Sequence, residues 1–269
     1  MRKPISAHAE TIRILKEHNK TAKKKFGQNF IIDPSVVKKI AELADVEGKD
    51  VIEVGPGLGA LTEQLSFLAN TVTAFEIDQD WIGHLNTHFK DQNVSIIQQD
   101  FLTVKNDDFS ANRCVGNLPY YITTPILFHI LENLDQIQVI TIMVQKEVAD
   151  RLSAEVGTKD YNALSIILNT LCDVKTVLKV NANVFMPKPN VDSAVVQLRR
   201  KENKKSSDLK AYFDFVKKAF TQRRKTLVNN LKEIKNLKEI LVEMNLSESV
   251  RAEALSKEQF EELYEKVKS

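Results

Sequence analysis

The stretch Val51-Ile-Glu-Val-Gly55-Pro-Gly57-Leu-Gly59 decides the fold of this chain. Four residues, three of them β-branched, lead into three closely spaced glycines, and the apolar pattern that follows over Ala60–Leu68 has helical periodicity. Glycine lets the backbone turn tightly and lets a ligand approach without a Cβ in the way. The pattern therefore predicts a strand, a turn and a helix of a parallel sheet. The turn is either a bare tight turn or a ligand-binding loop.

Short β-rich runs alternate with helical patterns from residue 31 onward, which predicts a mostly parallel twisted sheet with helices on both faces. A helix is expected from Asp33-Pro34 towards Ala44, because Asp can cap it and Pro suits the first helical position. The other expected strands are Thr71–Ile77, Val94–Gln98, Arg113–Gly116, Val139–Val144, Val174–Val180 and Ala194–Arg199. The other expected helices are Gln79–Phe89, Thr124–Leu131, Lys146–Leu152 and Asn162–Leu171.

A second domain is expected at the C-terminal end of the chain. The polar stretch Arg200–Ser207 is interpreted as a linker, and an apolar stripe from Leu209 to Leu231 lies on one face of a single amphipathic helix. We therefore predict an α/β domain over residues 1–203 and a small all-helical domain over residues 204–269. Residues 1–22 are expected to be disordered.

Two carboxylates end the strands that follow the glycine turn. Glu76 lies 21 residues after Gly55, where a carboxylate can accept two hydrogen bonds from a ribose diol. Asp100 ends the next strand, and its oxygens suit an adenine amino group. Each carboxylate could merely cap the following helix. Together with the glycine turn, however, they predict a crevice for an adenosine-bearing cofactor.

The spacing of the glycines separates two kinds of cofactor. Dinucleotide enzymes show G-x-G-x-x-G, with pyrophosphate at the helix N-terminus. This chain has G-x-G-x-G with Pro56 inside the turn, which disfavours phosphate binding. The form resembles the first motif of class I S-adenosylmethionine methyltransferases, in which the glycines pass the methionine part of the cofactor.

The sequence Asn117-Leu118-Pro119-Tyr120 follows the fourth strand. The lone pair of an adenine N6 is conjugated into the ring and is a poor nucleophile. The side-chain oxygen of Asn117 and the carbonyl of Leu118 can accept both amino hydrogens, which frees that lone pair for attack on a sulfonium methyl. Tyr120 offers a face for a base that has left its stack, an interaction worth roughly 1–3 kcal/mol.

These motifs together resemble the KsgA-type small-subunit (16S) rRNA adenine N6,N6-dimethyltransferases. Further matching segments are Lys24–Phe30 with Asp33, Phe185–Val195 and Gln222–Leu231. The resemblance implies a Rossmann-like class I methyltransferase that dimethylates N6 of two adjacent adenosines in the 3′-terminal hairpin loop of small-subunit rRNA. It also implies S-adenosylmethionine as cofactor and a partly assembled 30S subunit as substrate, with the enzyme acting as a monomer.

The resemblance also implies roles for particular residues. Leu118 and Tyr120 would meet the target adenine, and Phe185 would stack opposite Tyr120, with a loop anchor as the alternative reading of Phe185. Tyr121 departs from members that have Asn at this position, with little expected effect on mechanism. The residues expected to line the cofactor are Asn29, Ile31, Gly55, Gly57, Glu76, Asp100 and Asn117.

Two basic segments flank an otherwise acidic chain. Residues 1–30 have a local charge of +6 and residues 199–232 of +9, which leaves −13 for the remainder of a chain whose net charge is +2. Such segments are either solvated tails or a surface for a polyanion, and phosphate contacts dominate nucleic-acid affinity. Arg223, Arg224 and Lys225, placed within the amphipathic helix, are expected to contact rRNA phosphate.

The remaining composition restricts the class of protein. Two cysteines, Cys114 and Cys172, make no disulfide framework, and the five histidines show no metal spacing, so neither disulfides nor a metal site is expected. No apolar run is long enough for a bilayer, and the basic N-terminus lacks the apolar core of a signal peptide. We therefore expect a cytoplasmic protein without a membrane partner.

Three other functions remain open at this stage. The first is the large-subunit rRNA adenine methyltransferase that confers antibiotic resistance, against which Phe185–Ser193 and Gln222–Leu231 argue. A DNA adenine methyltransferase is disfavoured because no DNA-reading domain is apparent. A ribosome-assembly factor without methyltransferase activity is disfavoured by the intact set of Glu76, Asp100 and Asn117–Tyr120.

Overall fold

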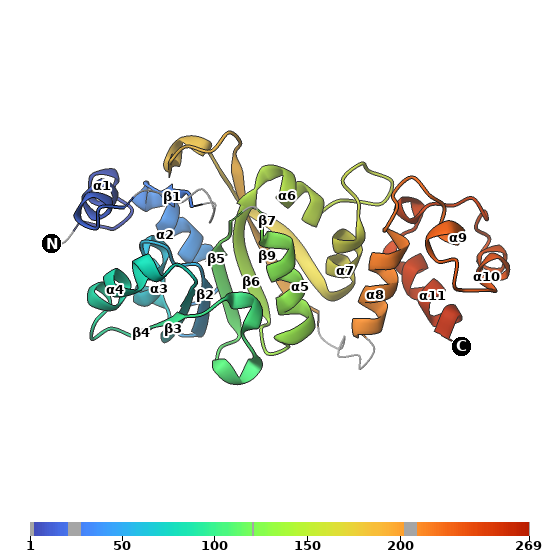
Figure 1. Cartoon of the computed structure of the whole chain (residues 1–269), viewed down its shortest axis with the longest axis horizontal. Coiled ribbons are helices and arrows are strands. Elements are labelled where there is room, and N and C mark those ends of the chain that lie inside the picture. Colours follow the sequence, from blue (N-terminus) through green and yellow to red (C-terminus); the bar gives the residue numbers. More distant parts are fainter. Residues whose placement is uncertain (1–2, 21–27, 120, 202–208, 269) are drawn as a thin grey trace. The chain divides into compact units, whose positions relative to one another are not determined.

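The computed structural model describes residues 3–20, 28–119, 121–201 and 209–268 (Figure 1). These residues group into two compact units, residues 1–149 with 175–199 and residues 150–174 with 200–269. The expected domain boundary between residues 203 and 204 stays a prediction. The expected first domain includes residues 150–174, which in the structure group with the second unit. Along the described chain, no helix combines the length and the apolar character that a membrane span requires.

The first unit is built on a seven-stranded sheet with the strand order β4-β3-β2-β5-β6-β9-β7. The neighbours from β4 to β6 pair in parallel, and β9 pairs antiparallel with β6. All residues from Val51 to Val54 are buried, as expected for a strand covered on both faces. The predicted α/β fold is confirmed. The strands are β2 (Asp50–Val54), β3 (Thr71–Glu76), β4 (Val94–Gln98), β5 (Arg113–Asn117), β6 (Val139–Gln145), β7 (Cys172–Val180) and β9 (Ser193–Arg200).

Two helices of the first unit begin at residues that cap them. Asp33 accepts a hydrogen bond from the backbone N–H of Ser35 at 2.9 Å, and Asp78 caps α4 in the same way. A separate two-stranded sheet joins β1 (Phe30–Ile31) to β8 (Phe185–Met186). The helices are α1 (His8–Glu17), α2 (Pro34–Leu43), α3 (Ala60–Leu68), α4 (Gln79–His88), α5 (Thr123–Asn133) and α6 (Lys146–Leu152), and the short 3₁₀ turns are η2 (Phe101–Thr103), η3 (Asn106–Asp108) and η4 (Ala182–Val184).

The second unit is helical and has a core of its own. Phe213 and Phe260 are fully buried in it, and the hydroxyl of Tyr161 donates to the carbonyl of Leu255 at 2.9 Å. This last bond connects the segment 150–174 to the C-terminal helices. The helices of this unit are α7 (Ala163–Leu171), α8 (Leu209–Ala219), α9 (Leu227–Asn230), α10 (Leu237–Glu243) and α11 (Lys257–Lys268), with the 3₁₀ turn η5 (Ala252–Ala254).

The predicted single helix from Leu209 to Leu231 is wrong. The chain leaves the helical path after Ala219, and the Asn230 side-chain amide donates to the carbonyls of Ala219 at 2.6 Å and Gln222 at 3.2 Å. Thr226 then caps the separate helix α9. The apolar stripe continues because both helices face one core, so periodicity alone did not reveal the break.

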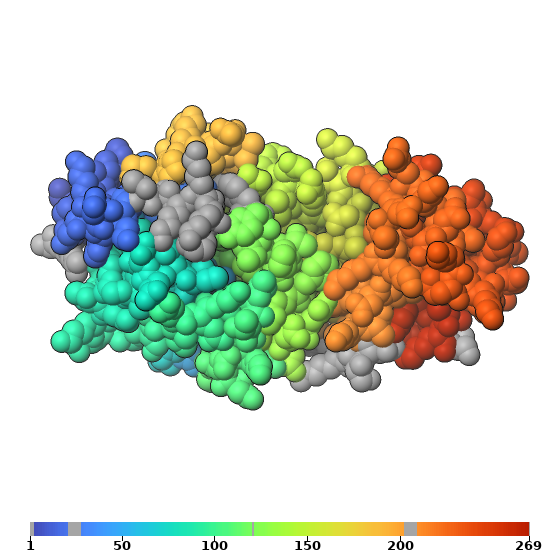
Figure 2. Space-filling view, in the orientation of Figure 1, coloured from blue at the N-terminus to red at the C-terminus, as the bar shows by residue number. Residues whose placement is uncertain are grey.

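The expected disorder of residues 1–22 is also wrong for the part that the structure describes, residues 3–20. These residues include helix α1 and are drawn in blue in Figures 1 and 2. Ile5 and Ile14 are each 1% exposed and pack in one cluster with Trp81. The burial of these side chains stabilises an ordered conformation that the basic composition of the segment conceals.

Candidate active site

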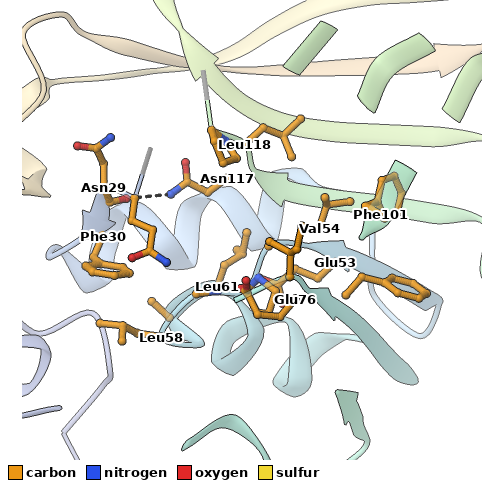
Figure 3. Close-up of a pocket in the computed structure, with 18 of the residues that line it drawn as sticks. Asn29, Phe30, Glu53, Val54, Leu58, Leu61, Glu76, Phe101, Asn117 and Leu118 are labelled. Atoms are coloured by element: carbon orange, nitrogen blue, oxygen red, sulfur yellow. Dashed lines mark hydrogen bonds between the residues drawn. The ribbon is translucent and has the colours of Figure 1, made fainter. Parts of the chain in front are cut away.

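A pocket lies at the carboxyl ends of the parallel strands, where ligands of open α/β sheets bind (Figure 3). Its lining comes from segments far apart in the sequence, because the ends of β2, β3 and β5 meet at this edge of the sheet. All seven residues predicted to line a cofactor line this pocket. Among its lining residues are Gln28, Asn29, Phe30, Ile31, Glu53, Gly55, Gly57, Leu58, Glu76, Asp100, Asn117 and Leu118.

The glycine turn between β2 and α3 has a backbone that requires glycine. Gly55, Gly57 and Gly59 have φ values of 69°, 57° and 89°, in the region that L side chains rarely adopt. A Cβ on Gly59 would lie only 2.7 Å from the ring of Phe89. At Gly55 and Gly57, which line the pocket, the turn therefore presents main chain without a side chain.

Glu76 braces this turn from the end of β3. Its Oε2 accepts a hydrogen bond from the N–H of Gly57 at 2.9 Å, and its Oε1 accepts one from the N–H of Asp78 at 2.7 Å. Burial raises the pKa of Glu76 above its ordinary value, although these two backbone donors act in the opposite direction. The carboxylate is thus held in one orientation at the pocket, where its lone pairs can accept further hydrogen bonds.

Asp100 satisfies both interpretations that the sequence left open for it. Its Oδ1 accepts a hydrogen bond from the N–H of Leu102 at 3.0 Å and so caps η2. The residue also lines the pocket. Within the described chain, no hydrogen bond to its Oδ2 is found, so one carboxylate oxygen can accept a ligand donor.

Asn117 is the last residue of β5, and its side chain lies at the pocket (Figure 3). The Nδ2 atom donates to the carbonyl of Asn29 at 3.2 Å, which orients the amide. The N–H of Leu118 donates to Met143 of the neighbouring strand at 3.2 Å, which fixes the backbone beyond the strand end. This geometry leaves the Asn117 Oδ1 atom as an acceptor beside the main chain of Leu118.

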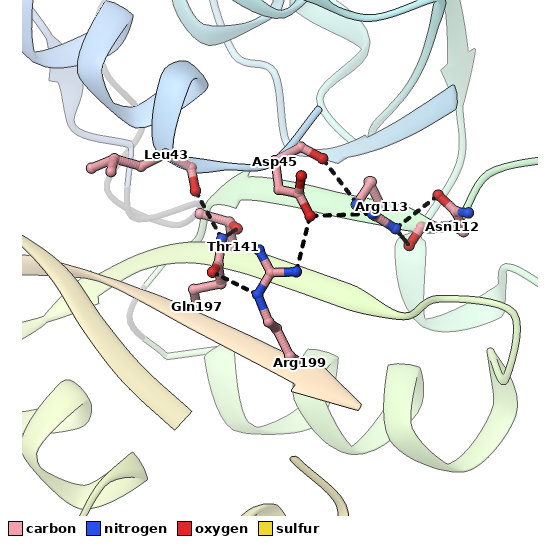
Figure 4. A network of polar contacts seen from close by, with 7 residues as sticks. All are labelled: Leu43, Asp45, Asn112, Arg113, Thr141, Gln197 and Arg199. Atoms are coloured by element: carbon pink, nitrogen blue, oxygen red, sulfur yellow. Dashed lines mark hydrogen bonds and ion pairs between the residues drawn. The ribbon is translucent and has the colours of Figure 1, made fainter. Parts of the chain in front are cut away.

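The opposite end of β5 is anchored by a polar network (Figure 4). Arg113 donates from Nε to the carbonyl of Asp45 at 2.9 Å and from Nη2 to its carboxylate at 3.2 Å. Arg199 of β9 donates to the same carboxylate at 2.9 Å. The network ties β5, the strand that ends at Asn117, and β9 to the loop before β2.

Glu53 is a pocket residue that the sequence placed just before the glycine turn without assigning it a role in the site. It is 1% exposed, and burial, together with the nearby negative charge of Glu76, raises its pKa to about 8. Its Oε2 has no hydrogen-bond partner among the described residues. Its place directly before the glycine turn was the only available signal, because burial depends on contacts from distant segments.

Other pocket residues were also missed. Ile77 and Tyr121 line the pocket although they are 51% and 61% exposed. Ile5 and Thr11 reach it from the N-terminal segment that was expected to be disordered. Tyr121 directly follows the Asn117–Tyr120 motif and Ile77 directly follows Glu76, so their positions in the sequence were available signals. No local motif marks Ile5 and Thr11.

Phe185 does not line the pocket. It is 3% exposed in β8, pairs with Ile31 of β1 and packs in the cluster that includes Val37 and Ile40. This position corresponds to the anchoring alternative rather than to an open stacking face, because the side chain is already covered by core residues. Tyr120, its expected stacking partner, lies outside the described residues.

The predicted basic cluster Arg223, Arg224 and Lys225 belongs to the second unit. The three residues are exposed in the turn between α8 and α9, not within a helix as predicted. Arg223 forms an ion pair with Glu253 at 2.8 Å. No group of three potential metal ligands is found among the described residues.

Comparisons with known proteins agree with one another. Residues 19–269 match the family described as ribosomal RNA adenine dimethylase. The chain is similar to proteins named ribosomal RNA small subunit methyltransferase A. One from Mycoplasmopsis pulmonis is 44% identical and covers 90% of this chain and 98% of its own. One from Bacillus cytotoxicus is 42% identical, with coverages of 96% and 95%.

Two solved structures extend the likeness to the fold. A dimethyladenosine transferase from Plasmodium falciparum superimposes with a TM-score of 0.75 at 25% identity, over 88% of this chain and 98% of its own. The 23S rRNA methyltransferase ErmE superimposes with a TM-score of 0.69 at 28% identity, over 89% and 100%. The fold is therefore shared with two enzymes whose names describe adenosine or rRNA methylation.

Proposed function

This chain belongs to the ribosomal RNA adenine dimethylase family, and on that premise we propose the reaction that it catalyses. The chain transfers methyl groups from S-adenosylmethionine to N6 of two adjacent adenosines in the 3′-terminal hairpin loop of small-subunit (16S) rRNA. The product is N6,N6-dimethyladenosine. Small-subunit enzymes about as long as this chain are 40–44% identical to it, which favours this substrate over large-subunit rRNA.

The observation that carries the proposal is the arrangement of Asn117 beside Leu118 at the pocket. The Asn117 Nδ2 is committed to Asn29, so its Oδ1 faces an incoming amine as an acceptor. We assign to this oxygen and to the carbonyl of Leu118 the two hydrogens of the adenine amino group. With its hydrogens held, the nitrogen lone pair would be available to attack the methyl carbon. The C–N bond would form as the carbon–sulfur bond breaks with its electron pair left on sulfur, and the N–H proton would then pass to solvent.

The pocket fits S-adenosylmethionine, which supplies an electrophilic sulfonium methyl group. The glycine turn offers bare main chain, and the buried Oε2 of Glu53 has no partner in the described chain, so a polar ligand has room and an unsatisfied group to meet. We assign the ribose hydroxyls to Glu76 and the adenine amino group to Asp100. Asn29 and Ile31 would cover the bound cofactor.

The partner that we propose is a partly assembled 30S subunit, approached by a monomeric, cytoplasmic enzyme. The exposed turn of Arg223, Arg224 and Lys225 supplies cationic groups of the kind that contact rRNA phosphates. Tyr120 is proposed to stack on the target adenine. These assignments rest on the motif resemblance and on the charge of the second unit.

The direct test is incubation of the protein with labelled S-adenosylmethionine and undermethylated small subunits, followed by nucleoside analysis. We expect N6,N6-dimethyladenosine in the 16S rRNA. A primer-extension map of both rRNAs from a deletion strain is the companion measurement. Methylation of large-subunit rRNA, or binding without any methyl transfer, would contradict the proposal.

A further inference from the structure

The N-terminal segment, residues 3–18, lies outside the part of the chain that the family comparison matches, which begins at residue 19. Two of its side chains nevertheless line the pocket. Ile5 and Thr11 are each 1% exposed, so they belong to the interior of the first unit. A segment that serves only as a solvated basic tail does not require this burial.

The segment is attached directly to the helix that follows the glycine turn. The backbone N–H of Ile5 donates to Oε2 of Glu63, in the first turn of α3, at 3.1 Å. The Thr11 hydroxyl donates to the carbonyl of Ile5 at 2.8 Å and thereby closes the chain into a turn before α1. Ile5 is thus held at both its N–H and its carbonyl.

An apolar cluster holds the rest of the segment in place. Ile14 is 1% exposed and packs with Leu58 of the glycine turn and with Trp81 of α4. Just after the segment, Lys20 forms an ion pair with Asp80 of α4 at 2.9 Å. The blue N-terminal segment accordingly borders the teal surface of α4 in Figure 2.

The position of the segment identifies the end of the pocket that it closes. Ile5 shares its cluster with Phe30 and Leu58, and a Cβ on Gly57 would lie 3.4 Å from the ring of Phe30. Phe30 and Leu58 lie on one side of the pocket, and Phe101, the residue after Asp100, lies on the other (Figure 3). The N-terminal wall is therefore next to the glycine turn and remote from the proposed adenine subsite.

We propose that Ile5 and Thr11 form the wall that encloses the amino-acid end of the cofactor, so that α1 docking and cofactor binding stabilise each other. The inference rests on the proposed function, because it takes S-adenosylmethionine as the ligand. A wall that excludes water strengthens the polar contacts of a zwitterion in the pocket. Linkage then requires that a ligand which favours the docked segment is itself bound more tightly when the segment is docked.

Hydrogen exchange on the full chain tests this coupling with two ligands. S-adenosylhomocysteine has the amino-acid end, and 5′-methylthioadenosine lacks it. We expect S-adenosylhomocysteine to slow exchange of the amides over residues 7–18 by at least about tenfold, and 5′-methylthioadenosine at equal occupancy to leave them unchanged. If S-adenosylhomocysteine protects the residues around Gly55 but not α1, the proposed wall is overturned.

A pair of matched variants provides the second test. Ile14→Ala loosens α1 without altering a residue that lines the pocket, and Ile137→Ala makes the same change at a fully buried site of the first unit away from it. By calorimetry we expect Ile14→Ala to weaken S-adenosylhomocysteine about tenfold and to leave 5′-methylthioadenosine unaffected, while Ile137→Ala weakens neither. Equal losses in both variants, or for both ligands, would show general destabilisation and overturn the inference.

These outcomes are distinct from failure of the proposed function. If the unaltered chain binds neither ligand, the assignment of the cofactor is wrong. If it binds both ligands equally well in every variant, the cofactor assignment is retained and only the role of the N-terminal segment is lost.

Discussion

Asn117 shows at the scale of one residue how the site depends on backbone position. It is the last residue of β5, where the parallel sheet brings the strand end to the edge that also holds Gly55 and Glu76. Its Nδ2 atom donates a hydrogen bond to the carbonyl of Asn29 at 3.2 Å. A residue 88 positions away in the sequence therefore decides that Oδ1 is the side-chain atom left to accept a hydrogen bond.

We expect Asn117→Ala to lower the rate of methyl transfer about 100-fold, because removal of one preorganised polar partner costs about 3 kcal/mol of barrier. Binding to the small subunit should be largely retained. Single-turnover methylation and subunit pull-down measure the two effects. Asn112→Ala is the control, since Asn112 lies just before the opposite end of the same strand. Near-normal turnover of Asn117→Ala would refute the proposed role.

Glu53 leads to a prediction about pH. Its ordinary pKa is 4.5, and burial raises the pKa to about 8 in the folded chain. Between these pH values the unfolded state has lost a proton that the folded state keeps. The contribution of Glu53 therefore lowers stability as the pH rises from about 4.5 to about 8.

Glu53→Gln should remove this contribution and flatten the dependence of unfolding free energy on pH, by up to about 1.4 kcal/mol per pH unit. Urea unfolding at several pH values between 5 and 8 measures the slope. Glu47→Gln, which makes the same substitution at an exposed side chain, is the matched control. Parallel profiles for the unaltered chain and Glu53→Gln would show that Glu53 does not keep its proton.

At the scale of elements, the α8–α9 connection shows what a helical stripe can conceal. The spacing of Leu209, Phe213 and Val216 predicts α8 correctly, and Leu227 and Leu231 continue the stripe. The Asn230 side-chain amide nevertheless donates to the carbonyl of Ala219, the last residue of α8, and the chain turns between the two helices. The turn exposes Arg223–Lys225 at a bend instead of along a helix face.

We expect the double variant Arg223→Ala/Arg224→Ala to weaken binding to the small subunit and to reduce the slope of log affinity against log salt by about 2, one unit for each phosphate contact. Binding measured over a series of salt concentrations gives the slope. Lys38→Ala/Lys39→Ala removes an equally basic, exposed pair from α2 and is the control. An unchanged salt slope in Arg223→Ala/Arg224→Ala would show that the turn is a solvated surface that makes no phosphate contact.

At the scale of the whole molecule, each unit has its own buried core, and a single tryptophan reports on one of them. Trp81 is the only tryptophan in the sequence and is fully buried in the first unit. Its fluorescence therefore follows unfolding of the unit that contains the pocket, while far-UV circular dichroism follows both units.

We expect S-adenosylhomocysteine at 100 times its dissociation constant to stabilise the transition reported by Trp81 by about 2.7 kcal/mol, because the ligand binds only the folded pocket. Denaturant titration followed by fluorescence measures the shift. Glu76→Ala should abolish most of it, since the Glu76 carboxylate braces Gly57 and is assigned to the ribose. A transition that does not respond to the ligand would place the cofactor elsewhere.

The sequence by itself determined the strands of the seven-stranded sheet, the helices that alternate with them, the glycine turn and the strand-end positions of Glu76, Asp100 and Asn117. These features follow from hydrophobic periodicity, capping residues and φ preferences, which act over a few neighbouring residues. The parallel sheet then brings the strand ends together at one edge, so a cofactor crevice can be expected from the sequence alone.

Only the tertiary structure decided that the N-terminal segment is ordered and that Phe185 is buried. It also decided the raised pKa of Glu53 and the grouping of residues 150–174 with the C-terminal helices. Each of these properties depends on atoms supplied by distant segments. Ile14 is ordered because Trp81 and Leu58 cover it, and the pKa of Glu53 is raised because the folded chain buries its carboxyl group. Patterns in the local sequence do not predict these neighbours, because folding brings them together from distant parts of the chain.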